Sequence, residues 1–283
     1  MTPVALVTDS TCDMGPAALR ALGVEMVPLT VHFGDESFRD WVDLTPAGFY
    51  EKLAHSAVLP TTSQPTPGEF AAVYRRLAEE GAESIVSIHL SSKLSGTYDS
   101  ALLAAKDAPV LVAVIDSATV CAGTALVIKA ACAARDVGGD FDAVVGAAQR
   151  SLGSIELFFV LDTLEYLVRG GRAGRATGLA AALLNIKPVL EVRGGVIEPF
   201  MRSKGTRKAI GEISRHVAER SRALGPLDVI LIEALAEDLR SELEEGLVAA
   251  GTRISTLAYG GIGTVIGTHA GPRALGVAYS PAR

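Results

Sequence analysis

The chain has 283 residues, of which 49% are hydrophobic and 20% are charged. These proportions are typical of globular proteins and exclude a chain that is disordered throughout. Its 26 Lys and Arg residues stand against 32 Asp and Glu residues, so the net charge is −6. A chain with an acidic balance is not expected to bind nucleic acid. The length predicts one large domain or two of modest size.

Three cysteines, Cys12, Cys121 and Cys132, form no C-x-x-C pair and have no zinc-site spacing with histidine. Such a sparse, odd set is typical of a reducing compartment. The first ten residues, MTPVALVTDS, lack the basic stretch of a secretory signal. The longest uncharged window, residues 254–272, contains five Gly and a Pro, which is too polar and too broken for a membrane span. We therefore expect a cytoplasmic protein with no metal, no cofactor and no integral membrane segment.

The first half of the chain alternates apolar segments with amphipathic ones. Extended segments are expected at 4–7, 24–33, 84–90 and 109–115. Helices are expected to begin near Pro16, at Thr45-Pro46, at Thr66-Pro67, near Thr97 and near Thr119. Thr66 and Glu69 have the spacing of a capping box, with Pro67 at the first helical position. Continuous apolar strands separated by helices indicate a parallel sheet covered on both faces.

The second half predicts a mixed sheet. Strands are expected at 155–161, 229–235 and 254–259, and helices at 206–224 and 236–250. Gly194-Gly195 divides residues 189–197 into two short apolar runs, which is typical of a hairpin. Because residues 151–154 interrupt the pattern, we expect two α/β domains, 1–152 and 153–283. A cleft between two such lobes is the expected ligand site.

Positive charge is concentrated between residues 169 and 222. This segment has 12 Lys and Arg residues against four Glu, a local balance of +8. One interpretation is a set of solvated helix faces. The other is a basic surface for a phosphate-bearing or acidic partner.

Two glycine-rich segments resemble nucleotide-binding loops but have the wrong context. Residues 261–267 read G-x-G-x-x-x-G, and only 16 residues follow them, too few for the βαβ unit of a dinucleotide fold. Residues 170–174 read GGRAG and lack the G-K-[ST] ending of a P-loop. The chain also has no H-E-x-x-H and no G-x-S-x-G motif.

Hydroxyl-rich segments lie next to the expected strands and helices. Three follow expected strands and one precedes a capped helix: 8–11, 91–97, 116–117 and 61–65. The carboxyl ends of parallel strands meet at one edge of a sheet, where ligands bind. Ser and Thr in such loops are commonly helix N-caps. Together they would also form a rim of neutral donors beside helix N-termini, suited to a carboxylate or phosphate.

His269 is the histidine with the most distinctive surroundings, because it lies among small residues in the segment THAGP. A single histidine is often a structural residue. The neighbouring glycines would, however, allow a ligand to approach closely. Both interpretations remain open from these residues.

Seven segments, read in order, resemble the DegV family over essentially the whole chain. They are VTDSTCDM at 7–14, TTSQPTPGEF at 61–70, LSSKLSGTYDSA at 90–101, VIDSATVCAG at 114–123, LEYLVRGGRAGR at 164–175, LLNIKPVLEVRGGVIEP at 183–199 and GTHAGPRALGVAY at 267–279. The resemblance implies a two-lobed α/β protein that binds one long-chain fatty acid between its lobes. It further implies a partner, because several members present the acid to the separate ATP-binding subunit of a bacterial fatty acid kinase.

The resemblance also implies site residues. The fatty acid carboxylate would be bound by Thr62, Ser95 and His269. Supporting loop positions would be Ser63, Gly96 and Thr97. The surface facing the kinase subunit or the phosphoryl group would comprise Arg172, Arg202, Lys204, Arg207 and Lys208. Lys204 and Thr206 stand where the family usually has Arg, which affects individual partner contacts, although the net charge of residues 202–209 remains positive.

Two alternatives come from the residues themselves. The first is a serine hydrolase with Ser95 as nucleophile, His269 as base, and Asp116 or Asp9 orienting the histidine. The second is a lipid reservoir or transport module that has no kinase partner.

Overall fold

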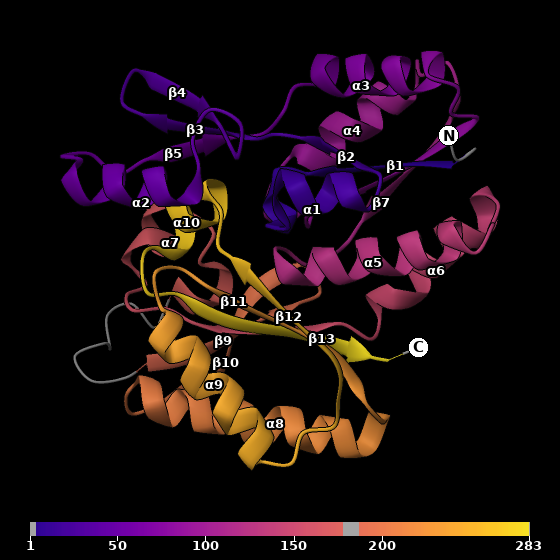
Figure 1. The fold of residues 1–283 in the computed structure, drawn as a ribbon. Helices are drawn as coiled ribbons and strands as arrows, with labels where there is room; N and C mark the ends of the chain where they lie inside the picture. Colours follow the sequence, from indigo (N-terminus) through magenta and orange to yellow (C-terminus); the bar gives the residue numbers. More distant parts are fainter. Residues whose placement is uncertain (1–3, 178–186, 283) are drawn as a thin grey trace.

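The computed structural model describes residues 4–177 and 187–282, which form two lobes (Figure 1). The N-terminal lobe is built on a parallel sheet with the strand order β2-β1-β6-β7. Its strands are β1 (Val4–Asp9), β2 (Val24–Val27), β6 (Ser84–His89) and β7 (Leu111–Asp116). The parallel sheet predicted for the first half is confirmed, and the ends of β1, β6 and β7 lie within two residues of those expected.

Helices cover both faces of this sheet. They are α1 (Gly15–Ala21), α3 (Pro67–Glu79), α4 (Thr97–Ala105), α5 (Ala122–Asp136) and α6 (Phe141–Leu152). Leu6 and Val86 point to one face, where they pack with side chains of α1, α5 and α6. Val7 and Ile85 point to the other face and pack with α3 and α4. Adjacent residues thus alternate between two buried faces, which explains the continuous apolar runs.

A second, smaller sheet in this lobe was not predicted. The expected extended segment 24–33 is divided between β2 and β3 (Thr30–Phe33), with Pro28 lying between the two strands. Strand β3 pairs antiparallel with β4 (Glu36–Arg39) and β5 (Thr61–Ser63), while helix α2 (Pro46–His55) joins the last two. Proline cannot donate a ladder hydrogen bond, so the segment passes from one sheet to the other at this point.

The C-terminal lobe contains a mixed sheet with the strand order β10-β9-β8-β13-β11-β12. Its strands are β8 (Glu156–Val160), β9 (Lys187–Arg193), β10 (Val196–Ser203), β11 (Leu227–Glu233), β12 (Ile254–Gly261) and β13 (Leu275–Pro281). Gly194 and Gly195 both have positive φ, 55° and 84°, in the turn of the β9–β10 hairpin. The predicted hairpin and mixed sheet are therefore confirmed. The central strand β13 was not predicted.

The two faces of the mixed sheet have different partners. Helices α8 (Thr206–Leu224) and α9 (Glu237–Ala249) cover the outer face, at the bottom of the view in Figure 1. The inner face, which includes Leu157, Ile230 and Ile232, packs with residues of the N-terminal lobe. Helix α5 lies between the two sheets and is buried along ten of its residues. This double burial explains why its sequence is apolar nearly all round.

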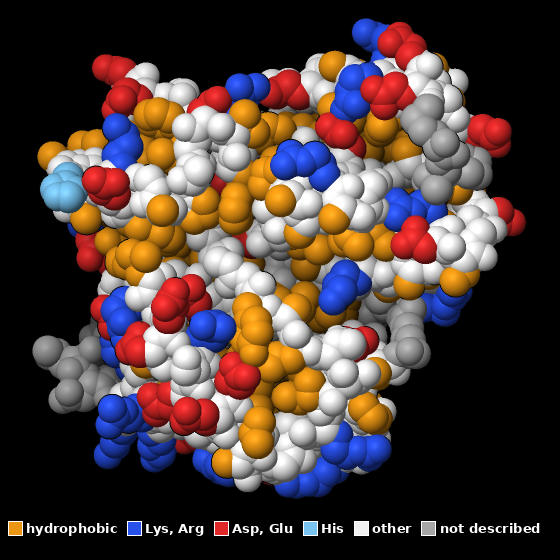
Figure 2. Space-filling view, in the orientation of Figure 1, with side chains coloured by type: hydrophobic (Ala, Val, Ile, Leu, Met, Phe, Trp, Pro, Cys, Tyr) orange, Lys and Arg blue, Asp and Glu red, His pale blue; other side chains and the backbone are white. Residues whose placement is uncertain are grey.

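Two short helices complete the junction between the lobes, namely α7 (Glu165–Arg169) and α10 (Thr264–Ala270). In Figure 2, hydrophobic side chains lie mainly in a band across the middle of the molecule, and charged side chains lie mainly at its upper and lower margins. The expected boundary after residue 152 falls in the turn between α6 and β8, and the division into domains stays a prediction. None of the helices in residues 4–177 and 187–282 is long and apolar enough to cross a membrane.

Candidate functional site

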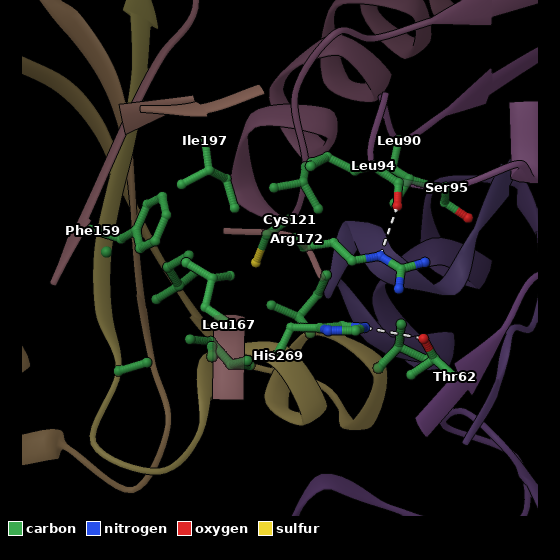
Figure 3. Close-up of a pocket in the computed structure, with 18 of the residues that line it drawn as sticks. Thr62, Leu90, Leu94, Ser95, Cys121, Phe159, Leu167, Arg172, Ile197 and His269 are labelled. Atoms are coloured by element: carbon green, nitrogen blue, oxygen red, sulfur yellow. Dashed lines mark hydrogen bonds between the residues drawn. The ribbon is translucent and has the colours of Figure 1, made fainter. Parts of the chain in front are cut away.

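A cavity of about 390 Å³ lies between the two lobes. Most of its wall is apolar, and its lining includes Leu29, Leu90, Val120, Phe159, Ile197 and Val265. Its polar side chains are Thr62, Ser63, Gln64, Ser95, Arg172 and His269. In Figure 3, Thr62, Ser95 and the Arg172 guanidinium lie towards one end, and Phe159 lies at the opposite end. The cavity is therefore amphipathic along its length.

A hydrogen bond between Thr62 and His269 spans the junction of the lobes. Thr62 Oγ1 and His269 Nε2 are 3.0 Å apart, although 207 residues separate them in the chain. Thr62 comes from β5 and His269 from the last turn of α10. Burial, and secondarily the charge of Arg172, lower the pKa of His269 from 6.5 to about 4. The imidazole is therefore neutral at neutral pH.

The GGR segment is built around this histidine. A Cβ at Gly170 would collide with His269 Nδ1, so the first glycine allows the imidazole to lie against the backbone. Arg172 Nη1 donates a hydrogen bond to the carbonyl of Gly170 at 2.7 Å. Arg172 Nε donates to the carbonyl of Leu94 at 3.2 Å. Within the described chain, no carboxylate forms an ion pair with Arg172. The guanidinium thus brings an uncompensated positive charge to an apolar cavity.

The loop that carries Ser95 is tied to the C-terminal lobe. Ser91 Oγ donates to the carbonyl of Gly195 at 2.8 Å, and Lys93 Nζ donates to the carbonyl of Gly194 at 2.7 Å. Both acceptors lie at the tip of the β9–β10 hairpin. Ser95 Oγ lies 2.9 Å from Thr97 Oγ1 and also accepts a hydrogen bond from the Thr97 amide at 3.3 Å. The Ser95 hydroxyl is thereby held at the start of α4.

Gln64 is a cavity residue that the sequence analysis did not single out. Its amide group occupies the space that a Cβ at Gly96 would fill, and its Nε2 donates to Ser100 Oγ at 3.2 Å. Gly96 therefore supports the site by admitting Gln64, which itself lines the cavity. The sequence signal available for this contact was the presence of the segments SQP at 63–65 and SGT at 95–97.

The structure separates Arg172 from the other basic residues with which the sequence analysis grouped it. Arg172 lines the cavity beside His269, whereas Arg202, Lys204, Arg207 and Lys208 are exposed. The last three line a second, polar pocket of about 520 Å³, which also includes Asp162, Asp238, Glu242 and Arg273. The basic surface is therefore balanced in part by neighbouring carboxylates, and Arg172 belongs with the cavity.

Two of the four hydroxyl-rich loops do not line this cavity, so the expectation of a rim formed by all four is wrong. Asp9 is buried and accepts hydrogen bonds from His89 Nδ1 at 3.0 Å and from the Leu90 amide at 3.1 Å. Asp116 accepts from Ser92 Oγ at 2.5 Å. Both carboxylates thus have other partners, and neither orients His269 as the hydrolase alternative requires.

Comparison with known proteins identifies the family. A family model described as "Uncharacterised protein, DegV family" matches residues 3–282. The chain belongs to the DegV family. A DegV domain-containing protein of Streptomyces coelicolor is 38% identical over 277 residues, which cover 98% of each chain.

Solved structures of DegV proteins share this fold over the whole chain. One from Thermus thermophilus, described by its fatty acid binding, has 35% identity and a TM-score of 0.93, with 100% of both chains covered. DegV of Bacillus subtilis, described as a fatty acid binding protein, has 31% identity and a TM-score of 0.90, again with 100% of both chains covered. The two-lobed α/β fold implied by the sequence resemblance is confirmed.

We expect Gly170→Ala to displace the His269 imidazole and break its bond to Thr62, because the new methyl group would overlap Nδ1. Overpacking of this kind lowers the free energy of unfolding by about 1–3 kcal/mol. Urea unfolding and the NMR signals of the imidazole would measure both effects. Gly153→Ala is the control, because no atom lies within 4 Å of a Cβ there. Unchanged His269 signals in Gly170→Ala would contradict the close contact.

We expect His269 to titrate near pH 4 in the ligand-free protein. An unfolded chain takes up this proton near pH 6.5, so acid favours unfolding. The free energy of unfolding does not depend on this group above pH 6.5, and it falls by about 3 kcal/mol as the pH drops from 6.5 towards 4, because burial disfavours the charged ring. NMR titration of the imidazole measures the pKa, and Arg172→Met should raise it. A midpoint near 6.5 in the native protein would contradict the desolvated site.

Proposed function

We propose that the protein binds a long-chain fatty acid in the cavity between its lobes. It presents the carboxylate to a separate, ATP-binding fatty acid kinase subunit. The observation that carries the proposal is the amphipathic cavity, with Thr62, Ser95, Arg172 and His269 among its polar residues and apolar side chains along the rest of its wall. The DegV structures described as fatty acid binding proteins support the choice of ligand.

Burial of the acyl chain supplies most of the binding free energy. A chain of about 14–16 methylenes would contribute roughly 11–13 kcal/mol at about 0.8 kcal/mol each. The cost of association and ordering lowers that sum considerably. Because the hydrocarbon alone gives ample affinity, the head group does not require a tight ion pair.

The polar residues suit a carboxylate that must remain reactive. Hydroxyls of Thr62 and Ser95 can each donate one hydrogen bond to it, and Arg172 compensates its charge. Neutral donors hold a carboxylate less strongly than a bidentate ion pair does. One oxygen therefore stays available to attack a phosphoryl group, a step that depends on in-line positioning and charge neutralisation.

On this proposal the protein carries no complete catalytic site, and the kinase subunit supplies ATP. An ATP-dependent partner fits the cytoplasmic location expected from the sequence. The exposed cations Arg202, Lys204, Arg207 and Lys208 are candidates for contacts with that subunit. Positive rim charges chiefly raise the association rate and make it dependent on salt.

Native mass spectrometry tests the ligand class directly. Protein purified without added lipid is expected to carry the mass of a fatty acid. Thr62→Ala should raise the dissociation constant for palmitate about 5- to 30-fold, because one neutral hydrogen bond contributes about 1–2 kcal/mol. Thr61→Ala is the matched control, since adjacent residues on β5 point to opposite faces and Thr61 is exposed. Equal affinity of all three proteins would contradict the assignment of Thr62.

Ser95→Ala distinguishes binding from hydrolysis. The proposal predicts weaker retention of palmitate and weaker binding of its methyl ester than of the free acid. If Ser95→Ala instead retained palmitate fully and lost cleavage of a short ester, the hydrolase interpretation would replace this one.

Charge reversal tests the partner surface. Arg202→Glu with Lys204→Glu should slow acyl-phosphate formation by the kinase subunit and leave palmitate affinity unchanged, because the acyl chain binds elsewhere. Arg75→Glu with Lys106→Glu is the control, since both side chains are exposed on the N-terminal lobe and the charge change is equal. Equal rates for both double variants across a range of salt would contradict a role for the basic surface.

A further inference from the structure

Helix α10, which carries His269, has no capping side chain of its own. Its N-cap residue is Gly263. One free backbone donor of the first turn, the Thr264 amide, is instead engaged by Asp40, from the loop after β4. Asp40 Oδ1 accepts from the Thr264 amide at 3.1 Å and from Thr264 Oγ1 at 2.7 Å. A carboxylate 224 residues away thus performs the role that a local Ser, Thr or Asp usually has.

The glycine at position 263 makes this arrangement necessary. A Cβ there would collide with Asp13 Oδ1 and lie 2.7 Å from Trp41 Nε1. No residue with a capping side chain fits at the position, so the cap has to come from elsewhere. Asp40 is completely buried, and an unpaired buried carboxylate is costly. Its two hydrogen bonds to Thr264 offset part of that cost.

Asp40 is charged at neutral pH. Burial raises its pKa from 3.8 to about 6, while hydrogen bonds from Thr264 and Ser10 oppose the rise. A negative charge at the first turn of a helix also interacts favourably with the helix dipole. The carboxylate is therefore a stronger cap than a neutral side chain would be.

The middle and the end of α10 also pack closely against side chains of other elements. A Cβ at Gly267 would lie 2.7 Å from the Tyr50 hydroxyl and 2.8 Å from Phe49 Cε1. A Cβ at Gly271 would collide with the Tyr166 ring. Gly263 and Gly271 are the N-cap and C-cap of the helix, and Gly267 lies in its middle. Close packing at these three points and the two hydrogen bonds to Thr264 together hold α10 against its neighbours.

We propose that Asp40 is a positioning residue for the ligand site: its carboxylate holds the first turn of α10 and thereby places the His269 imidazole against Thr62. His269 follows Thr264 by five residues, about 7.5 Å along the helix axis, so a shift of the first turn is transmitted directly. The inference rests on the proposed binding of a fatty acid, because His269 matters there through its contact with the head group.

A double-mutant cycle between Asp40 and His269 tests the proposal. Palmitate dissociation constants would be measured for Asp40→Ala in the wild-type and His269→Ala backgrounds. In the wild-type background we expect the dissociation constant to rise about 5-fold, the effect of losing one hydrogen bond to the head group. In the His269→Ala background the same substitution should change the constant less than 2-fold. If Asp40→Ala raised the dissociation constant equally in both backgrounds, its role would be purely structural and the proposal would be overturned.

Two further variants keep the test decisive. Asp40→Asn retains an acceptor oxygen for Thr264, so it should fold and recover most of the affinity even if Asp40→Ala is unstable. Asp43→Asn, in the same loop but exposed and paired with Arg39, should leave palmitate affinity unchanged. The NMR signals of the His269 imidazole should move in Asp40→Ala and not in Asp43→Asn. Unmoved signals in Asp40→Ala would also overturn the proposal.

Refutation of fatty acid binding and refutation of the role of Asp40 would give different results. If the wild-type protein bound no palmitate, fatty acid binding would be refuted, and the positioning role would fall with it. If the wild type and Thr62→Ala behaved as expected but the Asp40 and His269 effects were additive, only the role of Asp40 would be refuted.

Discussion

Close backbone approach between the lobes is the constraint on which the site depends. Gly195 lies against Ser91, and Gly267 lies against Tyr50, at distances that no Cβ would allow. Packed interiors leave no space for an extra methyl group without displacement of the neighbours. At these points the backbone of the C-terminal lobe therefore lies directly against side chains of the N-terminal lobe. The lobes meet closely there, and the apolar cavity stays open beside these contacts.

Burial of polar side chains at this junction determines its chemistry. Burial keeps His269 neutral, so the ring contributes a dipole and a hydrogen-bonding atom but no charge. Arg172 is the cation, and its bonds to the carbonyls of Leu94 and Gly170 orient it without neutralising it. An anionic group entering the cavity would gain a countercharge in a medium where charge interacts strongly. A neutral lipid would leave that guanidinium uncompensated, which supports the proposal that the ligand is an acid.

Elements with a local signal could be predicted from the sequence, and those defined by distant contacts could not. The Thr66 capping box and the Gly194-Gly195 turn form from their own residues and appear as expected. Strand β5 is three residues long and exists because β3 lies beside it. Strand β13 contains Gly276, where a Cβ would lie 2.9 Å from Ile232. Glycine in a strand interior weakens the strand signal, although here close packing against the neighbouring strand accounts for it.

The same difference between local signals and distant contacts applies to the candidate site. Resemblance to a family, and not spacing, linked Thr62 with His269, because no local pattern joins residues 207 positions apart. Asp40 was not singled out, because its role depends on contacts with α10, 224 residues away, that no local pattern reveals. Gly261, Gly263 and Gly267 were compared with a dinucleotide loop, which requires a different spacing, and Gly271 was considered only as a glycine that lets a ligand approach His269. In the structure a Cβ at 263, 267 or 271 would collide with side chains of other elements. Such glycines indicate close packing against another part of the protein, and here that packing surrounds the helix that carries the histidine.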